Sequence, residues 1–194
     1  MLSKVRIFPV SAFGGDGYPT LGNPIKLATL ESGETEVNNI RIKLTPTLKT
    51  KTLNADDREE KHSTVVGMEG ELEAYNVDST ALSSLLAIGK DTNGNAHFYA
   101  GNQTDKNVCI FCEGKNEKGK KFQTWIYCAT FEPLEEEQNT ESDTATSVIL
   151  KFSVKVITAG GKERTHARVY EGNTGYVSGE PTTSSLYKEP AVTQ

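Results

Sequence analysis

The strongest pattern along the chain is a pair of long apolar stretches joined by a polar connection. The stretches are residues 108–113 and 122–129, and the connection, residues 114–121, contains two glycines and four lysines. This pattern predicts an antiparallel hairpin. Because both of its faces are apolar, we expect it to be buried on both sides. Folding the hairpin near Lys118 gives four cross-strand pairs: Ile110 with Tyr127, Cys112 with Trp125, Cys109 with Cys128 and Phe111 with Ile126.

Other stretches alternate between apolar and polar residues with a period of two. Such alternation is typical of strands that bury one face. Residues 25–30 and 39–44 alternate in this way and are interpreted as a second hairpin. A strand at 66–74 and another at 148–156 follow the same rule. Their expected inward residues are Val66, Met68, Gly70, Leu72 and Ala74, and then Val148, Leu150, Phe152, Val154 and Val156. The chain is therefore predicted to be mainly β, with the skeleton of a β-sandwich or barrel.

One segment, about Ser79–Ile88, has the pattern of an α-helix. Asp78 or Ser79 caps its start, and Gly89 ends it. Its apolar stripe is formed by Leu82, Leu85, Leu86 and Ile88.

Two regions carry too few apolar residues to build a core. Residues 45–65 are interpreted as a long loop, and a loop of this length is usually functional or disordered. Residues 159–194 are rich in Gly, Ser, Thr and Pro. We interpret them as a strand remnant at 167–170 followed by a flexible C-terminal tail. The expected division is a β-domain at 1–158 and this tail region at 159–194.

Composition narrows the classes of function. The 194 residues suit one domain, and the formal net charge of −5 without a basic stripe disfavours sequence-specific nucleic-acid binding. No apolar run is long enough to span a membrane, and residues 1–6 lack the apolar core of a signal peptide. Three cysteines argue against a disulfide framework, so we expect reduced thiols.

Signals of catalytic or metal chemistry are weak. Cys109 and Cys112 have the spacing of a zinc or redox motif, but in a strand they point to opposite faces. Asp91, Asn93 and Asn95 imitate the start of a calcium loop, yet the glycine falls at the wrong position. We find no catalytic motif, and we expect no enzyme activity, cofactor or metal. A sugar binder should expose several aromatic side chains, whereas Trp125 lies within an apolar strand.

The order of several motifs resembles a known family. They are residues 18–25 with 31–34, Ala55–Arg58, Gly70–Glu73 before the helix, the turn Asp91–Gly94, and residues 127–143 with their acidic loop. Over about residues 18–158 the chain is similar to the major tail proteins of long, non-contractile-tailed phages, especially those of Gram-positive bacteria.

The resemblance implies a two-sheet β-sandwich or half-barrel of the tail-tube type, with the helix at about Ser79–Ile88 flanking the sheets. It also implies assembly into hexameric rings stacked as a tube, through which DNA passes without specific binding. It implies that the partners are further copies of the chain and the tape-measure, tail terminator and distal tail proteins. The expected location is the virion, after synthesis in the host cytoplasm. The alternatives are a carbohydrate- or protein-binding β-sandwich module and a fragment of a secreted enzyme.

Three sets of residues are candidate assembly sites. The long loop is expected to stack rings, and acid side chains two apart on a strand are expected to line the lumen. A basic tip and an acidic loop are expected to pair between subunits. The ring-stacking set is Leu48, Lys49, Lys51, Leu53, Asp56, Asp57 and Arg58; the lumen set is Glu69, Glu71 and Glu73; the charged set is Lys115, Lys118, Lys120, Lys121, Glu135, Glu136 and Glu137.

Overall fold

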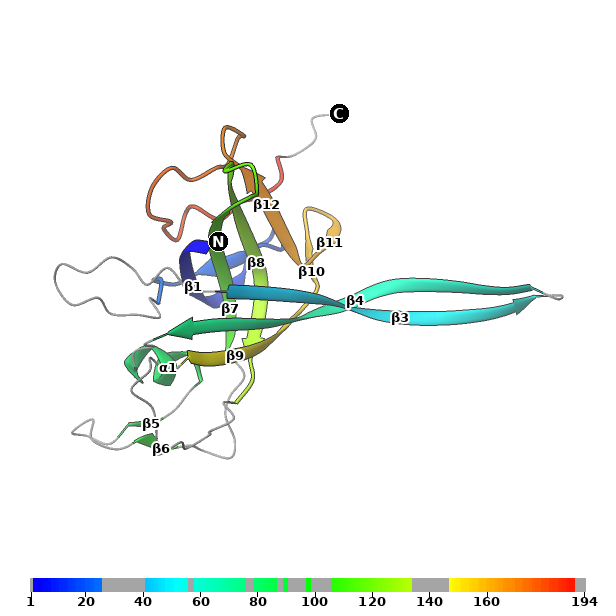
Figure 1. The fold of residues 1–194 in the computed structure, drawn as a ribbon, viewed down its shortest axis with the longest axis horizontal. Coiled ribbons are helices and arrows are strands. Elements are labelled where there is room, and N and C mark those ends of the chain that lie inside the picture. The colour runs from blue at the N-terminus through cyan, green and yellow to red at the C-terminus, as the bar shows by residue number, and fades with distance from the viewer. Residues whose placement is uncertain are drawn as a thin grey trace.

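A computed structural model describes residues 2–25, 41–55, 58–75, 79–86, 89–90, 97–98, 106–133 and 147–190. This part of the chain is mainly β, as predicted (Figure 1). Its main sheet has eight strands in the order β2-β1-β7-β8-β9-β4-β3, and β12 also pairs with β8. The elements are β1 Leu2–Phe13, β2 Pro19–Leu21, β3 Arg41–Ala55, β4 Arg58–Tyr75, α1 Ser79–Leu85, β5 Gly89–Lys90, β6 His97–Phe98, β7 Asn107–Lys115, β8 Lys121–Phe131, β9 Ser147–Val154, β10 Ile157–Ala159, β11 Lys162–Arg164 and β12 His166–Tyr170.

The predicted central hairpin is β7–β8, and both of its faces are buried. Its register differs by one residue from the prediction: Ile110 pairs with Ile126 and Phe111 with Trp125. A β-bulge between Val108 and Ile110 causes the difference. The bulge sets two residues of β8, Tyr127 and Cys128, opposite Cys109, so both can face the same side.

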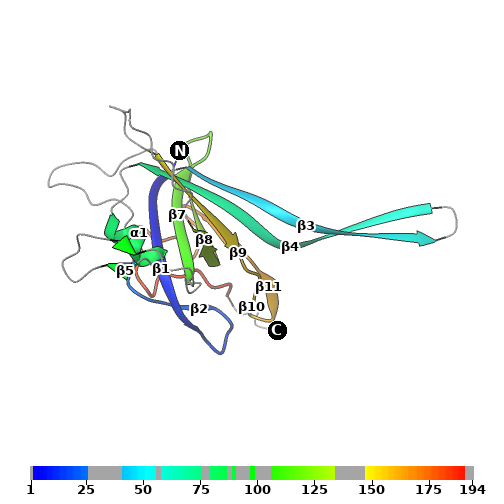
Figure 2. The same cartoon turned by 90° about the horizontal axis from the view of Figure 1, so that it is seen from below.

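The bulge coincides with a division of the sheet. On its outer edge, β8 pairs with β12 through residues 122–126 and with β9 through residues 129–131. The strands β9, β4 and β3 therefore leave the layer formed by β1, β7 and β8 and cross it at an angle (Figure 2). Together, the two halves of the sheet form a half-barrel, which agrees with the predicted fold class.

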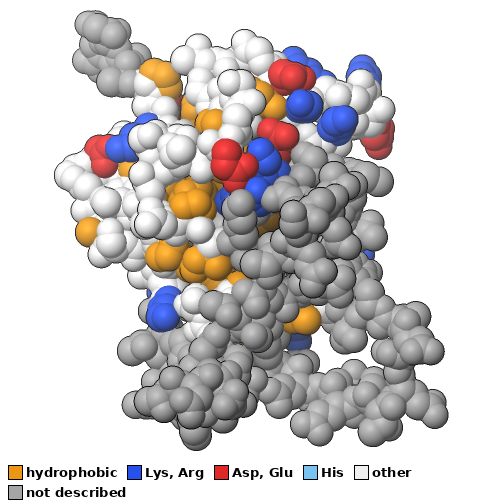
Figure 3. Space-filling model, turned by 90° about the vertical axis from the view of Figure 1, so that its left-hand side faces the viewer, with side chains coloured by type: hydrophobic (Ala, Val, Ile, Leu, Met, Phe, Trp, Pro, Cys, Tyr) orange, Lys and Arg blue, Asp and Glu red, His pale blue; other side chains and the backbone are white. Residues whose placement is uncertain are grey.

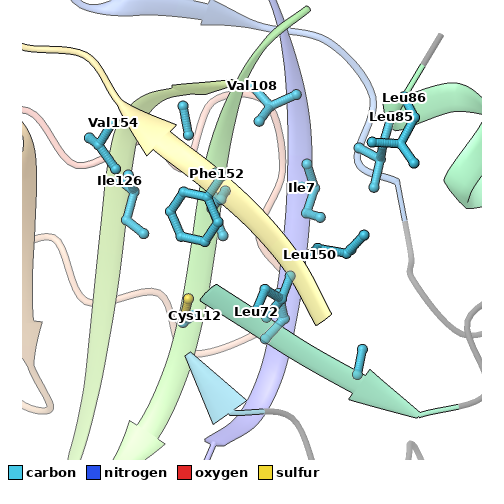
Figure 4. Packing of buried hydrophobic residues seen from close by; sticks show 14 residues of the cluster. Ile7, Leu72, Leu85, Leu86, Val108, Cys112, Ile126, Leu150, Phe152 and Val154 are labelled. Carbon is cyan, nitrogen blue, oxygen red and sulfur yellow. The ribbon is translucent and has the colours of Figure 1, made fainter. Parts of the chain in front are cut away.

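The inner core lies between these two halves. In Figure 4 its side chains converge from β1, β4, β7, β8, β9 and helix α1. Gly70 on β4 allows close packing here, because a Cβ at this position would lie 2.1 Å from the ring of Phe152 on the paired strand. The buried members are Val5, Ile7, Leu72, Ala74, Leu85, Leu86, Val108, Ile110, Cys112, Ile126, Ala129, Leu150, Phe152 and Val154.

A second cluster, the outer core, covers the opposite face of β1, β7 and β8. Trp125 lies at its centre, fully buried between Phe8 and Phe111, at ring-centroid distances of 5.9 and 4.7 Å. Gly17, in the turn before β2, has a φ of 79°, and a Cβ there would lie 1.8 Å from the Thr158 carbonyl oxygen. The members are Phe8, Tyr18, Leu21, Cys109, Phe111, Trp125, Tyr127, Cys128, Ile157, Ala159 and Leu186.

The structure corrects the expectation of a flexible tail. Strand β12 confirms the strand remnant at 167–170. Residues 172–190, which we call the strap, then cross the outer core, where Pro181 is fully buried and Leu186 packs beside the aromatic rings. The strap is held by single side chains that are scattered along the sequence without periodicity. Its sequence pattern therefore resembles that of a flexible tail. The boundary drawn at residue 158 therefore does not separate a folded part from a free one.

The other periodic segments agree with the prediction in most positions. Helix α1 occupies Ser79–Leu85, and Leu85 and Leu86 are buried. The alternation of β4 and β9 is also confirmed, except that Val66 and Val156 are exposed. Of the predicted second hairpin, residues 26–40 lie outside the described residues. In the described part, residues 41–44 belong to β3, which pairs with β4.

The segment predicted as a long loop is instead a β-hairpin, and this corrects the expectation at residues 45–65. Strands β3 and β4 pair continuously from Arg41 opposite Glu73 to Ala55 opposite Arg58. Only β4 residues from Met68 onward also pair with β9. The remainder, 47–55 and 58–67, which we call the arm, extends away from the body in both views (Figures 1 and 2). The backbone groups of the two strands satisfy each other, so the arm forms without a core of its own.

Candidate assembly surfaces

The arm carries an apolar stripe that continues the inner core beyond the body. On β3, Ile42 and Leu44 are partly buried against the inner core, and Leu48 follows on the same face because side chains two apart share a face. Leu48 pairs with Val65, and a bulge adds Val66 beside them. Once the body ends, nothing within the described residues covers the stripe: Leu48 is 57 % exposed, and Val65 and Val66 are each 49 % exposed.

Five of the seven predicted ring-stacking residues belong to this hairpin. Leu48 and Lys49 are exposed on β3. Lys51 and Leu53 of β3 lie opposite His62 and Glu60, and β4 begins at Arg58. Asp56 and Asp57 lie outside the described residues. The structure therefore places these five residues on an extended arm, while the role of the set in stacking rings stays a prediction.

The predicted lumen set shares one face of β4. Glu69 and Glu71 are exposed and Glu73 is half-buried, while Gly70, Leu72 and Ala74 between and beyond them are buried. Cations flank this row. Glu71 lies between Lys43 of β3, at 3.8 Å from its carboxylate, and Lys151 of β9, and Arg41 lies opposite Glu73. The face thus combines three carboxylates with three cations instead of forming the uncompensated acidic row that the sequence suggested.

The basic tip is the turn of the β7–β8 hairpin. Lys115, Lys118 and Lys120 are exposed, and Lys121 is half-buried. The Asn116 side chain orders the turn, because its oxygen accepts hydrogen bonds from the Lys118 and Lys120 backbone N–H groups at 3.0 and 2.9 Å. Their expected partners, Glu135, Glu136 and Glu137, lie outside the described residues, so the charge pairing stays a prediction.

The cysteines are buried as the strand argument requires. Cys112 belongs to the inner core, whereas Cys109 and Cys128 belong to the outer core. Burial raises the pKa of Cys112 to about 12 and raises the pKa values of Cys109 and Cys128 as well. These thiols therefore stay protonated near neutral pH, and the thiolate is the form that attacks or binds metal.

Within the described residues, no group of three or more His, Cys, Asp and Glu side chains is placed to hold a metal ion. No helix in this part of the chain has the length and apolar character to cross a membrane. The calcium-like turn at 91–95 lies outside the described residues. Trp125 is fully buried and offers no stacking surface to a sugar.

Sequence reasoning missed two groups of residues with a clear structural role. Val65 and Val66 complete the apolar stripe of the arm, whereas the sequence pattern predicts Val66 only as an inward residue and does not include Val65. The signal for the arm is the period-two pattern of Thr47, Leu48 and Lys49 onward. The second group holds the strap to the body. Gln123 bonds to Val177, 54 residues later in the chain, and Arg6 bonds to Glu180, 174 residues later. No local sequence pattern predicts contacts between residues so far apart in the chain.

Comparison with known proteins leaves the family open. No family model matches the chain, and no curated protein matches it. Among solved structures, the chain is similar to one in the six-fold symmetrised cryo-EM structure of the anti-feeding prophage (AFP) baseplate. The TM-score is 0.40 and the sequence identity 9 %, with 86 % of this chain and 92 % of that chain covered. A similarity of this size does not assign the chain to a family.

Proposed function

We propose that the chain is a structural virion protein of a phage tail, whose copies form hexameric rings stacked into a tail tube. The order of motifs shared with major tail proteins motivates this proposal. The structural observation that carries it is the arm, with its exposed apolar stripe at Leu48, Val65 and Val66. We further propose that the protein is not an enzyme and that its role lies in its contacts with other copies.

In an isolated subunit, the arm gains little stability from the rest of the chain. A lone two-stranded ribbon is at best marginally stable in water. It becomes stable when a third strand pairs with it or when another element packs against its apolar face. Covering Leu48, Val65 and Val66 would stabilise the arm by roughly 25 cal/mol for each Å² of apolar surface removed from water. A neighbouring copy supplies such a cover, and the arm then connects one ring with the next.

The opposite side of the body offers a different surface. Figure 3 shows the face turned away from the arm, where hydrophobic side chains form patches left of the centre and most charged side chains gather towards the upper right. When one surface of a subunit meets a different surface of the next, the contact is heterologous and generates rings or filaments. Two unlike surfaces on one chain suit this mode of assembly.

The lumen assignment forms a finer part of the proposal. Glu69, Glu71 and Glu73 would face the channel, and the cations beside them would leave that wall close to electrically balanced. DNA is held by basic side chains that displace its counterions. A wall in which carboxylates accompany every cation would let DNA pass without binding. The further partners would be the tape-measure, tail terminator and distal tail proteins.

Negative-stain electron microscopy of the purified protein tests assembly directly. We expect rings or tubes at high protein concentration. Deleting residues 49–60 removes most of the arm but leaves Leu48 and Val65 joined by four residues, a loop length that hairpins commonly use. This variant should fold and form no tubes. The double substitution Leu48→Ser and Val65→Ser should act in the same direction.

The matched control is Phe13→Ser, which removes a similarly exposed apolar side chain from the far end of β1. It should assemble like the unmodified chain. Tubes of normal length from the deletion variant would exclude the arm as the stacking element. Sedimentation that finds only monomers at every concentration and salt level would contradict the proposed tube as a whole.

A further inference from the structure

The strap is attached to the body in an unusual way. After Glu171, whose N–H donates to the Lys121 carbonyl, the strap's backbone–backbone hydrogen bonds within the described residues are local turns. These turns join Asn173 to Tyr170, Tyr176 to Asn173, and Ser185 to Thr182. No sheet ladder holds the strap, so its hold on the sheet comes from side chains at three places.

The first anchor is Gln123 of β8, whose side chain is buried beneath the strap. Its Nε2 donates to the Val177 carbonyl at 2.6 Å, and its Oε1 accepts from the Val177 N–H at 2.9 Å. Gln123 also donates to Glu113 at 2.9 Å, and the Tyr176 hydroxyl donates to the same carboxylate at 3.2 Å. One amide side chain thus replaces one rung of a β-ladder.

The second anchor is Glu180, which pairs with Arg6 and with Lys4 of β1. The Arg6 side chain is only 6 % exposed. A guanidinium at such a position needs a counter-charge, because an unpaired buried charge is strongly destabilising. The ion pair between Arg6 and Glu180 therefore contributes more than the exposed ion pairs of the strap, which are typically worth little.

The third anchor holds the end of the strap. The Tyr127 hydroxyl donates to the Tyr187 carbonyl at 3.0 Å, and the Glu189 N–H donates to the Tyr18 hydroxyl at 3.0 Å. Glu189 also pairs with Lys162 and Arg164, and Lys188 pairs with Asp16 at 2.6 Å. Between the second and third anchors, Pro181 and Leu186 are the buried apolar side chains of the strap.

The first turn of the strap contains two positions suited to a hinge. Gly172 and Gly175 have φ values of 87° and 88°, in the region that favours glycine. Beyond them the strap buries few apolar side chains, whereas the strands below form two complete cores. Segments with few buried apolar contacts open at lower free energy than the sheet they cover.

We infer that the strap is a latch: it opens as one unit about Gly172 and Gly175 while the eight-stranded sheet stays folded. The closed state covers the outer core, and the open state exposes the aromatic side chains around Trp125. The chain therefore has a second apolar face that it shows only conditionally, in contrast to the permanently exposed stripe of the arm. This inference does not rest on the proposed function.

Native-state hydrogen exchange tests the latch on the unmodified chain. The Val177 and Glu189 amides, which bond to side chains of the body, should exchange together through an opening whose free energy falls less steeply with denaturant than that of global unfolding. Amides of β7 and β8 should exchange through global unfolding, with a steep dependence on denaturant. Trp125 is the sole tryptophan, so its emission should shift to the red at denaturant concentrations where the β8 amides remain protected.

A matched pair of variants sharpens the test. Glu180→Gln removes a carboxylate that pairs with Arg6 and should raise the opening equilibrium constant of the strap about tenfold, as expected when a hydrogen bond between charged groups is replaced by a weaker one. Glu132→Gln makes the same change in charge at an exposed position just after β8 that belongs to none of the three anchors, and it should leave the opening unchanged. Added salt should increase strap opening in the unmodified chain more than in Glu180→Gln.

One result would overturn the latch. It is exchange of the Val177 and Glu189 amides at the same free energy and with the same denaturant dependence as the β8 amides. In that case the strap would unfold only together with the sheet. Equal opening in the Glu180 and Glu132 variants would also contradict the role of the Arg6 anchor. Because the exchange measurement uses the unmodified chain, the inference remains testable even if Glu180→Gln does not fold.

Discussion

The β7–β8 hairpin and the β3–β4 arm are both antiparallel pairs, but they differ in what covers them. The first is buried on both faces, between the inner and outer cores. The described side chains of the arm, from Thr47 to Lys49 and at Val65 and Val66, are exposed. The same kind of backbone pairing thus forms the centre of the fold in β7–β8 and an extension from the body in the arm.

The difference shows where the stabilising free energy of each hairpin originates. Fully burying a large apolar side chain contributes about 1.5–3 kcal/mol, and β7–β8 collects this gain on both faces within the subunit. The arm gains almost none of it there. Changes in β7–β8 should therefore lower the stability of the isolated chain, whereas changes in the arm should act on contacts with other molecules.

The largest expected effect is that of Trp125→Ala. Because Trp125 is fully buried between Phe8 and Phe111, its loss leaves a cavity in the outer core, and such truncations cost roughly 3–5 kcal/mol. Urea denaturation followed by circular dichroism measures the change. Phe13→Ala, at an exposed position of β1, serves as the control and should change little. Similar losses in both variants would remove the contrast between buried and exposed positions.

Gly70→Ala should have the next largest effect. The new methyl group would lie 2.1 Å from the Phe152 ring, so the ring must move, and overpacking of this kind costs about 1–3 kcal/mol. Gly67→Ala is the matched control on the same strand, because its Cβ would lie 3.6 Å from the Val154 carbonyl oxygen, an ordinary contact. Adding Phe152→Leu should recover part of the loss in Gly70→Ala but nothing in Gly67→Ala. Thermal unfolding of the four variants checks this.

Acidification should weaken the strap before the sheet. Burial alone would raise the pKa of Glu180, but hydrogen bonds from Arg6 and Lys4 outweigh it and hold the pKa below its ordinary value. A hydrogen bond from Lys188, followed by one from the Tyr18 N–H, lowers the pKa of Asp16. A carboxyl whose pKa is lowered on folding stabilises the folded state above its unfolded pKa, and this stabilisation disappears as the pH falls through the folded pKa.

Both carboxylates are about half exposed, so the pH effect should be smaller than that of Gly70→Ala. Trp125 emission recorded from pH 6 downward should report it, beginning below about pH 4.5, near the ordinary pKa of a glutamate. Glu180→Gln should flatten the profile. A profile that Glu180→Gln leaves unchanged would show that other carboxylates control the acid transition.

Leu48→Ser should have the smallest effect on the subunit. The side chain is already mostly exposed, so the free energy of unfolding should change by no more than about 0.5 kcal/mol. Its effect should instead appear in the concentration at which the protein assembles, measured by sedimentation. A loss of stability comparable to that of Gly70→Ala would mean that the stripe is covered within the subunit.

Much of the fold was predictable from period-two patterns. The inward residues Leu72, Leu150 and Phe152 follow directly from alternation, and the apolar faces of β7–β8 indicate burial on both sides. The register of that hairpin was not predictable, because the extra residue at Tyr127 and Cys128 leaves no mark in the hydrophobic pattern. A one-residue bulge changes every pair beyond it without changing composition.

The candidate surfaces were predictable only in part. The acid row on β4 follows from spacing, but the cations beside it come from β3 and β9, which are distant in sequence. The strap could not be foreseen, since Gln123 and Val177 meet across 54 residues and neither belongs to a repeating pattern. The low apolar content of residues 45–65 predicts a loop, because by this criterion a polar strand without a core of its own resembles a loop.

The pairing of the arm also bears on how its length can change over evolutionary time. Between Leu48 and its tip, each residue of β3 has one partner on β4. Inserting or deleting one residue from each strand near the tip would preserve every pair closer to the body, whereas an unmatched change would shift the register and exchange the two faces. Each matched step alters the reach of the arm by about 3.3 Å. Natural variants should therefore differ here by even numbers of residues, so that reach varies in steps while the body stays constant.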